Sequence, residues 1–355
     1  MVCKGVSENR WCYISFKKEK MSTLKWISTN ESEGKAKLVI NKEPNKIFKR
    51  NDKDFLNVLS IFGAARQGKS FLMNCLAGKN GVFRISNQKD SCTQGIDISE
   101  HTMNVKEFSR IHCRRGDPET NFSQKMRVGF IDAEGQGDKD ITYDANLICP
   151  ILLISKCVIF NWKDSLQKDR ILNLLGVMQK AAVNVSMEAE VSGEEESGTI
   201  FGHLHLVFRD WQYTGSDEKA VLKDIFKEER SADNAAAIRN QIRRSIQQSF
   251  ESITVWLFPA PVESSAELSS ELSYEKTSLA FQNKLAEFRQ VLSEQLQEPM
   301  TFNGRALTGR IIPGMVNEIA RVLNSGQSVK PASAYVNMTK TEVEQLRTQL
   351  EVRYR

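Results

Sequence analysis

The stretch Gly63-Ala64-Ala65-Arg66-Gln67-Gly68-Lys69-Ser70 decides the fold of this chain. It fits the pattern G-x-x-x-x-G-K-S, in which two glycines let the backbone curl until successive N–H groups point inward at phosphates. An apolar run, residues 58–62, precedes the stretch, and a helix-forming run, residues 71–76, follows it. The sequence therefore predicts a P-loop between a strand and a helix N-terminus, because a glycine turn with an exposed lysine would leave the flanking pattern unexplained.

The same motif assigns two side chains, and a second motif supplies a carboxylate. Lys69 is expected to reach the β- and γ-phosphates, and the Ser70 hydroxyl is expected to be a ligand of Mg²⁺. Residues 128–135 form an apolar strand that ends in D-x-x-G. There Asp132 would hold the metal through water, and the Gly135 N–H would sense the γ-phosphate.

Two further residues near these motifs are candidates for a role in the site. Thr93 lies in a polar loop between the P-loop and D-x-x-G, where a second hydroxyl ligand of Mg²⁺ is expected. Gln136 directly follows Gly135, the place where a glutamine orients the attacking water in small GTPases. A glutamine in a flexible loop can equally well face solvent, and the sequence leaves these two alternatives open.

The usual guanine-recognition motif N/T-K-x-D is missing, because residues 87–90 and 161–164 approach it only with the wrong spacing. Instead, the apolar run 205–208 leads into Arg209-Asp210-Trp211. Asp210 could accept hydrogen bonds from the guanine N1 and N2 amines, which adenine cannot offer. Chemistry alone does not decide this, since Arg-Asp at the end of a strand is more often a surface ion pair.

Outward from the P-loop, apolar β-rich runs alternate with helical patterns. Apolar residues recur at helical spacing over residues 171–182 and 281–296. Such alternation predicts an α/β fold, a P-loop NTPase three-layer sandwich with a mainly parallel sheet, followed by the start of a helical region. The expected strands are residues 37–40, 58–62, 127–131, 157–161, 205–209 and 253–258.

Three segments are expected: a lead-in over residues 1–35, a P-loop domain over 36–328, and a linker with the first helix of a truncated helical domain over 329–355. Residues 186–198, which are acidic and rich in Gly and Ser, suggest a mobile surface loop. Thr339-x-x-Glu342 matches a capping box, which predicts a helix beginning there with Val343, Leu346 and Leu350 on its apolar face.

Composition excludes several classes of protein. The 355 residues carry a net charge of +5 without a concentrated basic run, which argues against nucleic acid as a partner. Seven scattered cysteines, an odd number without C-x-x-C pairs, favour reduced thiols in a cytoplasmic protein. His203 and His205 alternate with apolar residues and are expected on one face of a strand, without a metal role. No run is apolar enough to cross a bilayer, so membrane contact would need a partner or residues beyond this chain.

Four motifs in order resemble the nucleotide-binding signature of the guanylate-binding protein and atlastin family of large GTPases, within the dynamin superfamily: G-A-A-R-Q-G-K-S-F-L-M-N, S-C-T-Q-G-I, D-A-E-G-Q-G-D and F-R-D-W. The first and last are closer to atlastins, and the third is closer to guanylate-binding proteins. The resemblance covers roughly residues 36–330. It implies a Mg²⁺-dependent enzyme that hydrolyses GTP to GDP and forms a homodimer through its G domain when loaded.

The resemblance also implies roles for individual residues. Arg66 resembles the arginine that this family turns onto the phosphates of its own site, and Ser91 resembles the switch serine beside the attacking water. The expected catalytic residues are Arg66, Lys69, Ser91 and Gln136, and the expected metal ligands are Ser70, Thr93 and Asp132. The expected nucleotide contacts are Gly63, Ala65, Arg66, Gln67, Gly68, Lys69, Ser70, Phe71, Gly135, Arg209 and Asp210.

One departure from the family concerns Gln136, because guanylate-binding proteins usually carry an apolar residue at that position. Two other functions stay open. The chain could be a nucleotide-gated scaffold that hardly hydrolyses GTP, although every expected catalytic position carries a workable residue. It could also be an ATPase, which only the missing N/T-K-x-D favours.

Overall fold

The computed structural model describes residues 23–32, 35–85, 93–111, 125–163, 166–185, 199–215, 217–231, 233–263, 272–302 and 304–353. Its strands are β1 (Thr23–Ser32), β2 (Lys35–Ile40), β3 (Phe55–Phe62), β4 (Ile96–Asn104), β5 (Met126–Ala133), β6 (Ser155–Trp162), β7 (Phe201–Phe208), β8 (Phe250–Leu257), β9 (Thr301–Phe302) and β10 (Arg305–Ala306). Its helices are α1 (Asn45–Arg50), α2 (Lys69–Ala77), α3 (Val105–Arg110), α4 (Ile141–Leu152), α5 (Lys168–Val183), α6 (Glu218–Phe226), α7 (Asn234–Ser249), the 3₁₀ helix η2 (Tyr274–Lys276), α8 (Leu279–Gln295), α9 (Ile311–Asn324) and α10 (Pro331–Arg353).

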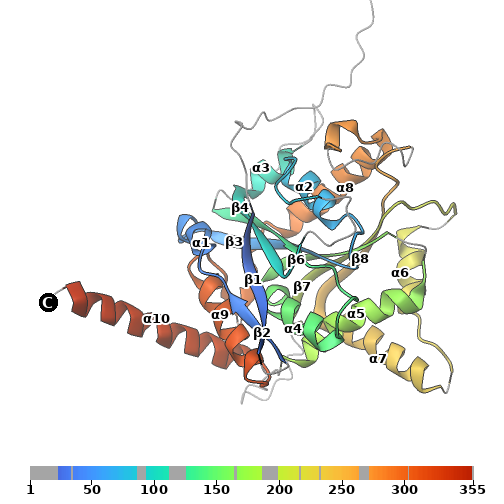
Figure 1. Ribbon diagram of the computed structural model, residues 1–355. Coiled ribbons are helices and arrows are strands. Elements are labelled where there is room, and N and C mark those ends of the chain that lie inside the picture. Colours follow the sequence, from blue (N-terminus) through green and yellow to red (C-terminus); the bar gives the residue numbers. More distant parts are fainter. Residues whose placement is uncertain are drawn as a thin grey trace, which may run out of the picture.

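The large sheet has the strand order β2-β1-β4-β5-β3-β6-β7-β8 (Figure 1). The five strands from β5 to β8 in this order pair in parallel, whereas β1, β2 and β4 are joined to their neighbours antiparallel. The mainly parallel sheet predicted from the sequence is thus confirmed. All six predicted strands are present, and each observed strand starts earlier than predicted, while the predictions 205–209 and 253–258 run one residue past the ends of β7 and β8. Strand-helix-strand connections place helices on both faces of such a sheet.

Two apolar clusters cover the two faces, and successive strand residues alternate between them as the two-residue period of a strand requires. In β6, Val158 and Phe160 face the cluster formed with α1, α4, α5, α6, α7 and α9. Cys157 and Ile159 face the second cluster, formed with α2, α3 and α8. All eight residues of β6 are buried, which explains why the sequence shows a continuous apolar run there.

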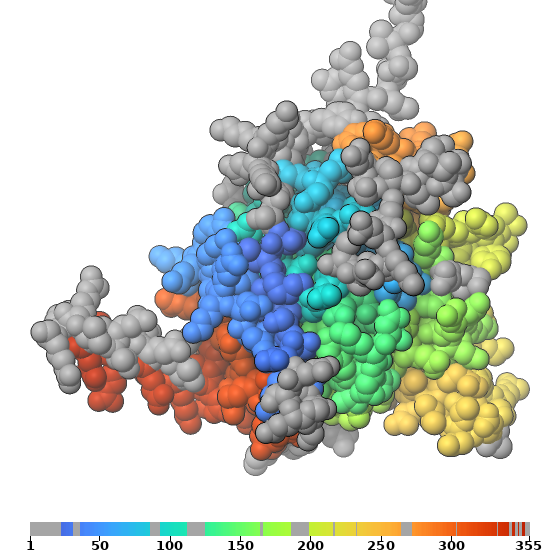
Figure 2. All heavy atoms as spheres, in the orientation of Figure 1, coloured from blue at the N-terminus to red at the C-terminus, as the bar shows by residue number. Residues whose placement is uncertain are grey.

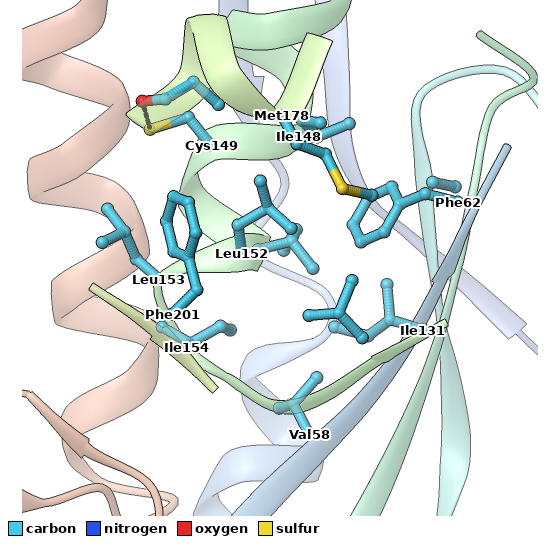
Figure 3. Packing of buried hydrophobic residues seen from close by; sticks show 14 of the residues in the cluster. Val58, Phe62, Ile131, Ile148, Cys149, Leu152, Leu153, Ile154, Met178 and Phe201 are labelled. Atoms are coloured by element: carbon cyan, nitrogen blue, oxygen red, sulfur yellow. Dashed lines mark hydrogen bonds between the residues drawn. The ribbon is translucent and has the colours of Figure 1, made fainter. Parts of the chain in front are cut away.

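Figure 3 shows part of the larger cluster, in which α4 packs against both the sheet and α5. Leu152 of α4 lies among Val58, Ile131 and Phe201 of the sheet, and Met178 of α5 approaches Phe62. The Cys149 thiol donates weakly to the carbonyl of Ala181 at 3.8 Å. Burial raises the pKa of this thiol to about 12, so it packs as a small apolar group.

The first correction concerns the expected lead-in, because residues 23–32 form strand β1 inside the sheet, between β2 and β4. Trp26 and Ile27 are fully buried, and the Trp26 ring lies 4.8 Å from that of Phe48. In the space-filling view the blue atoms of this hairpin lie directly beside the green atoms of α4 (Figure 2). Lys25 and Thr29 interrupt the apolar pattern, and tertiary contacts explain both, as described below.

The second correction concerns the C-terminal helix. α10 begins at Pro331, so Thr339 lies inside the helix, where its hydroxyl donates to the Tyr335 carbonyl at 3.0 Å and caps nothing. Proline is favoured in the first turn of a helix, and this signal outweighs the capping-box pattern. Val343 and Leu350 are 60% and 53% exposed, so the later turns bury neither. Figure 1 shows these turns extending away from the body of the molecule.

Within the described residues, none of the helices combines the length and the apolar character that crossing a bilayer requires. Cys75, Cys149 and Cys157 are buried and form no disulfide, as expected, whereas the other four cysteines and the predicted mobile loop at 186–198 lie outside the described residues.

Candidate functional site

The candidate site lies where the parallel strands end, at the carboxyl edge of the sheet. Ile61 of β3 is level with Asp132 of β5, and Trp162 of β6 is level with Phe208 of β7. The residues that follow these strands therefore emerge at one edge, which is the place where α/β sheets bind ligands. The register thus brings together the P-loop, the D-x-x-G segment and Arg209-Asp210.

The P-loop adopts a backbone that glycine permits. Gly63 has φ +135°, and a Cβ atom there would lie 2.2 Å from the carbonyl oxygen of Asn161. Hydrogen bonds also join the loop to β6, because the Asn161 side-chain amide donates to the Gln67 carbonyl at 2.8 Å. Gln67 returns a contact through its side chain, which accepts from the backbone N–H of Lys163 at 3.2 Å. The loop is therefore fixed on its β6 side before any nucleotide binds.

Lys69 is the first residue of α2, and its ammonium donates to the Ala64 carbonyl at 2.9 Å, across the P-loop. The side chain is buried, and burial lowers its pKa from the ordinary value, while Asp132, Glu134 and Asp138 act in the opposite direction. A buried ammonium that holds only one carbonyl of its own loop can exchange that partner for phosphate oxygens. This arrangement suits an anion placed over the N-terminus of α2.

The three expected metal ligands meet at one carboxylate oxygen. Asp132 Oδ2 accepts from the Ser70 hydroxyl at 2.5 Å and from the Thr93 hydroxyl at 3.3 Å. Within the described residues its other oxygen, Oδ1, is buried without a partner. Burial raises the pKa of Asp132 to about 6, which means that its charged form lacks compensation. A hard cation with oxygen ligands such as Mg²⁺ would compensate it, so the side chains present fit that ion.

The D-x-x-G segment lies directly against the P-loop. A Cβ atom on Gly135 would come within 2.3 Å of the Ala65 Cα, so only glycine fits there. The next residue, Gln136, donates its backbone N–H to the Gly63 carbonyl at 3.1 Å. Its side chain is only 3% exposed, and among the described residues neither amide atom has a hydrogen-bond partner. Gln136 therefore does not face solvent, which removes one of the two alternatives left open by the sequence.

Arg66 occupies the crown of the P-loop with φ +60°, a left-handed conformation that costs energy for a residue with a side chain. Its side chain is exposed, and no hydrogen bond or ion pair engages it in the part of the chain that the structure describes. The guanidinium is thus available to a ligand but does not cover the phosphate site in this arrangement. Ser91, the expected switch serine, lies outside the described residues.

The Arg209-Asp210 pair lies at the end of β7, beside the P-loop. Arg209 is buried and directs its guanidinium to the Gly68 carbonyl at 3.4 Å, near the rings of Phe71 and Phe281. Burial lowers its pKa from the ordinary value. Asp210 has φ +55° and points the other way, toward Lys163. The two residues do not pair with each other, so the surface ion pair considered from the sequence is wrong.

Phe71 contributes to the packing under the site, because its ring lies 6.0 Å from that of Phe281 on α8. The same helix holds the far end of α2, where Arg289 donates to the carbonyls of Leu76 and Cys75 at 2.6 and 2.8 Å. A guanidinium at a helix C-terminus satisfies carbonyls that lack helical partners and complements the helix dipole. α8 thus anchors the helix that carries the P-loop lysine.

Glu134 is a site residue that the sequence analysis passed over. Its Oε2 accepts from the Gly95 N–H at 2.7 Å and from the Tyr143 hydroxyl at 3.3 Å, and its Oε1 pairs with Lys139 at 3.0 Å. The carboxylate therefore joins the loop of Thr93 to the segment after D-x-x-G. The one feature of the sequence that could have identified Glu134 as a site residue is its position inside the D-x-x-G motif.

Lys25 and Lys163 were also missed. Lys25 of β1 donates to the Gln94 carbonyl and pairs with Asp97 at 2.5 Å. Lys163 faces Asp210 from the end of β6, with 3.4 Å between Nζ and Oδ2. Because both lysines come from segments that the sequence placed outside the site, only the sheet pairing brings them to it.

The chain is similar in sequence to known proteins. The family described as "Guanylate-binding protein, N-terminal domain" matches residues 35–299. Guanylate-binding protein 5 of Mus musculus is 25% identical over 323 residues, which are 86% of this chain and 51% of the relative. Guanylate-binding protein 5 of Homo sapiens is 27% identical over 220 residues, 58% of this chain and 34% of the relative. The chain thus spans about half the length, or less, of the curated relatives it matches.

Among solved structures, a crystal structure of a dimerization-deficient mutant of Toc33 from Arabidopsis thaliana matches with a TM-score of 0.36 and 11% identity. The match covers 75% of this chain and 91% of the Toc33 chain.

Proposed function

This chain belongs to the guanylate-binding protein family, and we propose that it is a Mg²⁺-dependent GTPase that binds GTP at the P-loop, hydrolyses it to GDP and pairs through its G domain when loaded. The observation that carries the proposal is the convergence of Ser70 and Thr93 on the buried carboxylate of Asp132, next to Lys69. Hydroxyl and carboxylate oxygens grouped beside an ammonium are what a nucleotide triphosphate with its cation needs.

Each part of the site has a role in this proposal. Ser70, Thr93 and Asp132 would hold Mg²⁺, and the ion would neutralise charge on the β- and γ-phosphates. Lys69 leaves the Ala64 carbonyl and donates to phosphate oxygens. The N–H groups of the P-loop, from Gly63 to Phe71, surround the phosphates, and the Gly135 N–H contacts the γ-phosphate.

Gln136 is proposed to orient the attacking water. Its buried amide supports this role, because a buried polar group without a partner costs free energy that a structural role would avoid. Ser91 is proposed to contact the same water, as in the family motif that it matches. Asp210 and Arg209 are proposed to recognise the guanine base and to shape its pocket.

Arg66 is proposed to turn onto the phosphates when two loaded domains meet. Its exposed, unengaged side chain supports a role that begins only on assembly. A guanidinium contributes there because it neutralises charge that builds up as the γ-phosphate leaves. The same exposure is compatible with the alternative function, a nucleotide-gated scaffold with little hydrolysis.

The test is GTP turnover per site over a wide range of protein concentration, for the wild type and Arg66→Ala. We expect specific activity to rise with concentration, and Arg66→Ala to lower the maximum by roughly a thousandfold while GTP still binds. Arg244→Ala is the matched control, since Arg244 is a half-exposed arginine of α7 that pairs with Glu228 away from the site. Flat activity, or an unaffected Arg66 variant, would refute the dimer-activated mechanism. Tight GTP binding without turnover at any concentration would favour the scaffold.

The proposal includes a division of the chain. The GTPase domain is proposed to run to residue 328, as the sequence predicted, but to start at β1 because that strand completes the sheet. Residues 329–355 begin the following helical region. A cytoplasmic location and the atlastin-like character of the P-loop stay predictions from the sequence.

A further inference from the structure

The carboxylate of Asp210 is held in a conformation that needs an explanation. The residue has φ +55°, a left-handed backbone conformation that disfavours residues with side chains, although aspartate tolerates it better than most. Its side chain is 21% exposed, yet the Oδ1 atom is buried and has no hydrogen-bond partner in the described part of the chain. The carboxylate therefore keeps one oxygen free for a donor that the protein itself does not supply.

The second carboxylate oxygen of Asp210 forms an ion pair. Asp210 Oδ2 lies 3.4 Å from the ammonium of Lys163, whose side chain is 42% exposed. The residues that precede this pair are joined by their backbones, because the Arg209 N–H donates to the Trp162 carbonyl at 2.6 Å. The Lys163 N–H donates in turn to Gln67 of the P-loop at 3.2 Å. The lysine is thus held at its backbone between the phosphate loop and Asp210, whereas its side chain is partly exposed.

A carboxylate beside an ammonium matches the edge of guanine. That edge presents, in a row, the acceptor O6, the donor N1–H and the donor N2 amine. The carboxylate can accept from N1 and N2 with its two oxygens, and a neighbouring ammonium can donate to O6. Adenine presents an amine where guanine has O6, so an ammonium there would meet a donor instead of an acceptor.

We propose that Lys163 is a specificity-determining residue that donates a hydrogen bond to guanine O6, next to the contacts of Asp210 with N1 and N2. The inference rests on the proposed function in one respect, since it takes Asp210 as the residue that binds the base. It adds the recognition of O6, which the sequence motifs leave without a residue. The ion pair seen without nucleotide keeps the two groups side by side until the base takes its place between them.

Two observations separate Lys163 from other candidates. Arg209, the other cation beside Asp210, is buried with its guanidinium directed to Gly68, away from the free oxygen. An ion pair as exposed as Lys163–Asp210 contributes little to the stability of the fold, so stability does not explain the presence of this lysine. Its removal is therefore expected to alter binding and leave the fold intact.

The experiment measures dissociation constants of GDP, 6-thio-GDP and IDP by competition against a fluorescent GDP. 6-Thio-GDP keeps N1–H and the N2 amine but replaces O6 by sulfur, a weaker acceptor, whereas IDP keeps O6 and lacks the N2 amine. We expect Lys163→Met to weaken GDP binding roughly tenfold and to remove the preference for GDP over 6-thio-GDP. The preference for GDP over IDP, which belongs to Asp210, should persist. Lys163→Arg, which keeps a donor, should restore most of the difference.

Lys168→Met is the matched control, because Lys168 is also 42% exposed and also pairs with an aspartate, Asp224, at 2.6 Å. It should leave all three constants unchanged, and both methionine variants should melt near the wild-type temperature. The inference is overturned if Lys163→Met binds GDP as the wild type does, or loses GDP and 6-thio-GDP equally. Asp210→Asn tests the underlying assignment separately, because it should shift the preference of the protein from GDP to XDP. If the preference does not shift, Asp210 does not bind the base, and this conclusion is independent of the result for Lys163.

Discussion

Unpaired polar atoms gather around the candidate nucleotide site. Buried side-chain atoms without a hydrogen-bond partner occur in several parts of the described chain, for example on Trp26 and Arg127. Five of the residues that carry them lie at the carboxyl ends of the parallel strands or directly after these ends: Asp132, Gln136, Asn161, Arg209 and Asp210. Leaving such an atom unpaired costs about 1–3 kcal/mol, so proteins rarely keep several together. Their concentration is explained if a ligand completes them. The two strained residues, Arg66 and Asp210, lie in the same place.

His205 shows the opposite situation, a buried polar residue that the protein satisfies itself. Its ring nitrogens lie 2.7 Å from the Thr254 hydroxyl and 2.8 Å from Gln295 Oε1. Burial lowers the pKa of His205 to about 3 from its ordinary 6.5. Below pH 6.5 the unfolded chain therefore binds a proton that the folded protein does not bind, and stability falls as the pH falls toward 3.

We expect the contribution of His205 to the free energy of unfolding to fall between pH 6.5 and pH 4, by at most about 1.4 kcal/mol per pH unit, whereas Asp132 and Asp144, whose pKa burial raises to about 6, act in the opposite direction below that pH. His205→Gln, which stays neutral, should make this dependence shallower. Denaturant unfolding at pH 7 and pH 5 checks it. His101, whose pKa burial lowers to about 4, should preserve part of the slope. An unchanged slope in the variant would show that His205 does not carry the effect.

At the scale of elements, strand β1 braces the loop that carries Thr93. Lys25 donates to the Gln94 carbonyl, and a Cβ atom on Gly95 would lie 2.2 Å from the Ile27 carbonyl oxygen. Thr29 of the same strand lies 3.0 Å from the Tyr143 hydroxyl, which contacts Glu134. The strand thus contacts the Thr93 loop directly and reaches the D-x-x-G segment through Tyr143, and it can set the position of Thr93.

Lys25→Met should raise the Mg²⁺ concentration that gives half-maximal GTP turnover by several-fold, because the Thr93 loop loses its tie to β1. The melting temperature should change little, since the side chain is 37% exposed and such pairs contribute less than about 1 kcal/mol. A magnesium titration of turnover measures the effect. Lys37→Met, on the exposed side of neighbouring β2, is the control. Equal magnesium dependence in both variants would refute the bracing role.

At the scale of the whole molecule, the start of α10 lies beyond the proposed end of the GTPase domain but packs, with α9, on the body of that domain. Val329, Ala334 and Met338 are buried in the larger apolar cluster, and the Val329 N–H donates to the Asn184 carbonyl at 2.7 Å. The amide of Asn324 both donates to and accepts from the backbone of Leu38 in β2. The early turns of α10 therefore stabilise the fold, whereas the later turns extend away from it (Figure 1).

A chain ending at residue 328 should melt several degrees below the full chain, because it loses the burial of Val329, Ala334 and Met338. A chain ending at residue 341 retains these contacts and should melt close to the full chain. Thermal unfolding followed by circular dichroism compares the two. Equal melting temperatures would mean that α10 adds nothing to the domain, and the division at 328 would then be the structural boundary as well.

The sequence by itself determined the fold class and the placement of the phosphate site. Gly63 and Gly68 permit the backbone conformation of the P-loop, so the loop is predictable from these residues alone. The apolar run of β6 is continuous because both faces of the strand are covered, so a buried strand is predictable from the run alone. The D-x-x-G segment was predictable for the same reason. Six strands and the helices after Lys168 and Leu279 followed from periodicity.

Tertiary structure alone decided what reaches the site from distant segments. β1 carries Lys25 and Thr29, which interrupt its apolar pattern, and only pairing with β2 and β4 makes it a strand. The burial of Gln136 and the approach of Lys163 to Asp210 depend on how adjacent strands end in register. A sequence motif predicts the backbone conformation of the short segment that contains it. Contacts between distant segments depend on the packing of the whole sheet, so a local sequence pattern does not predict them.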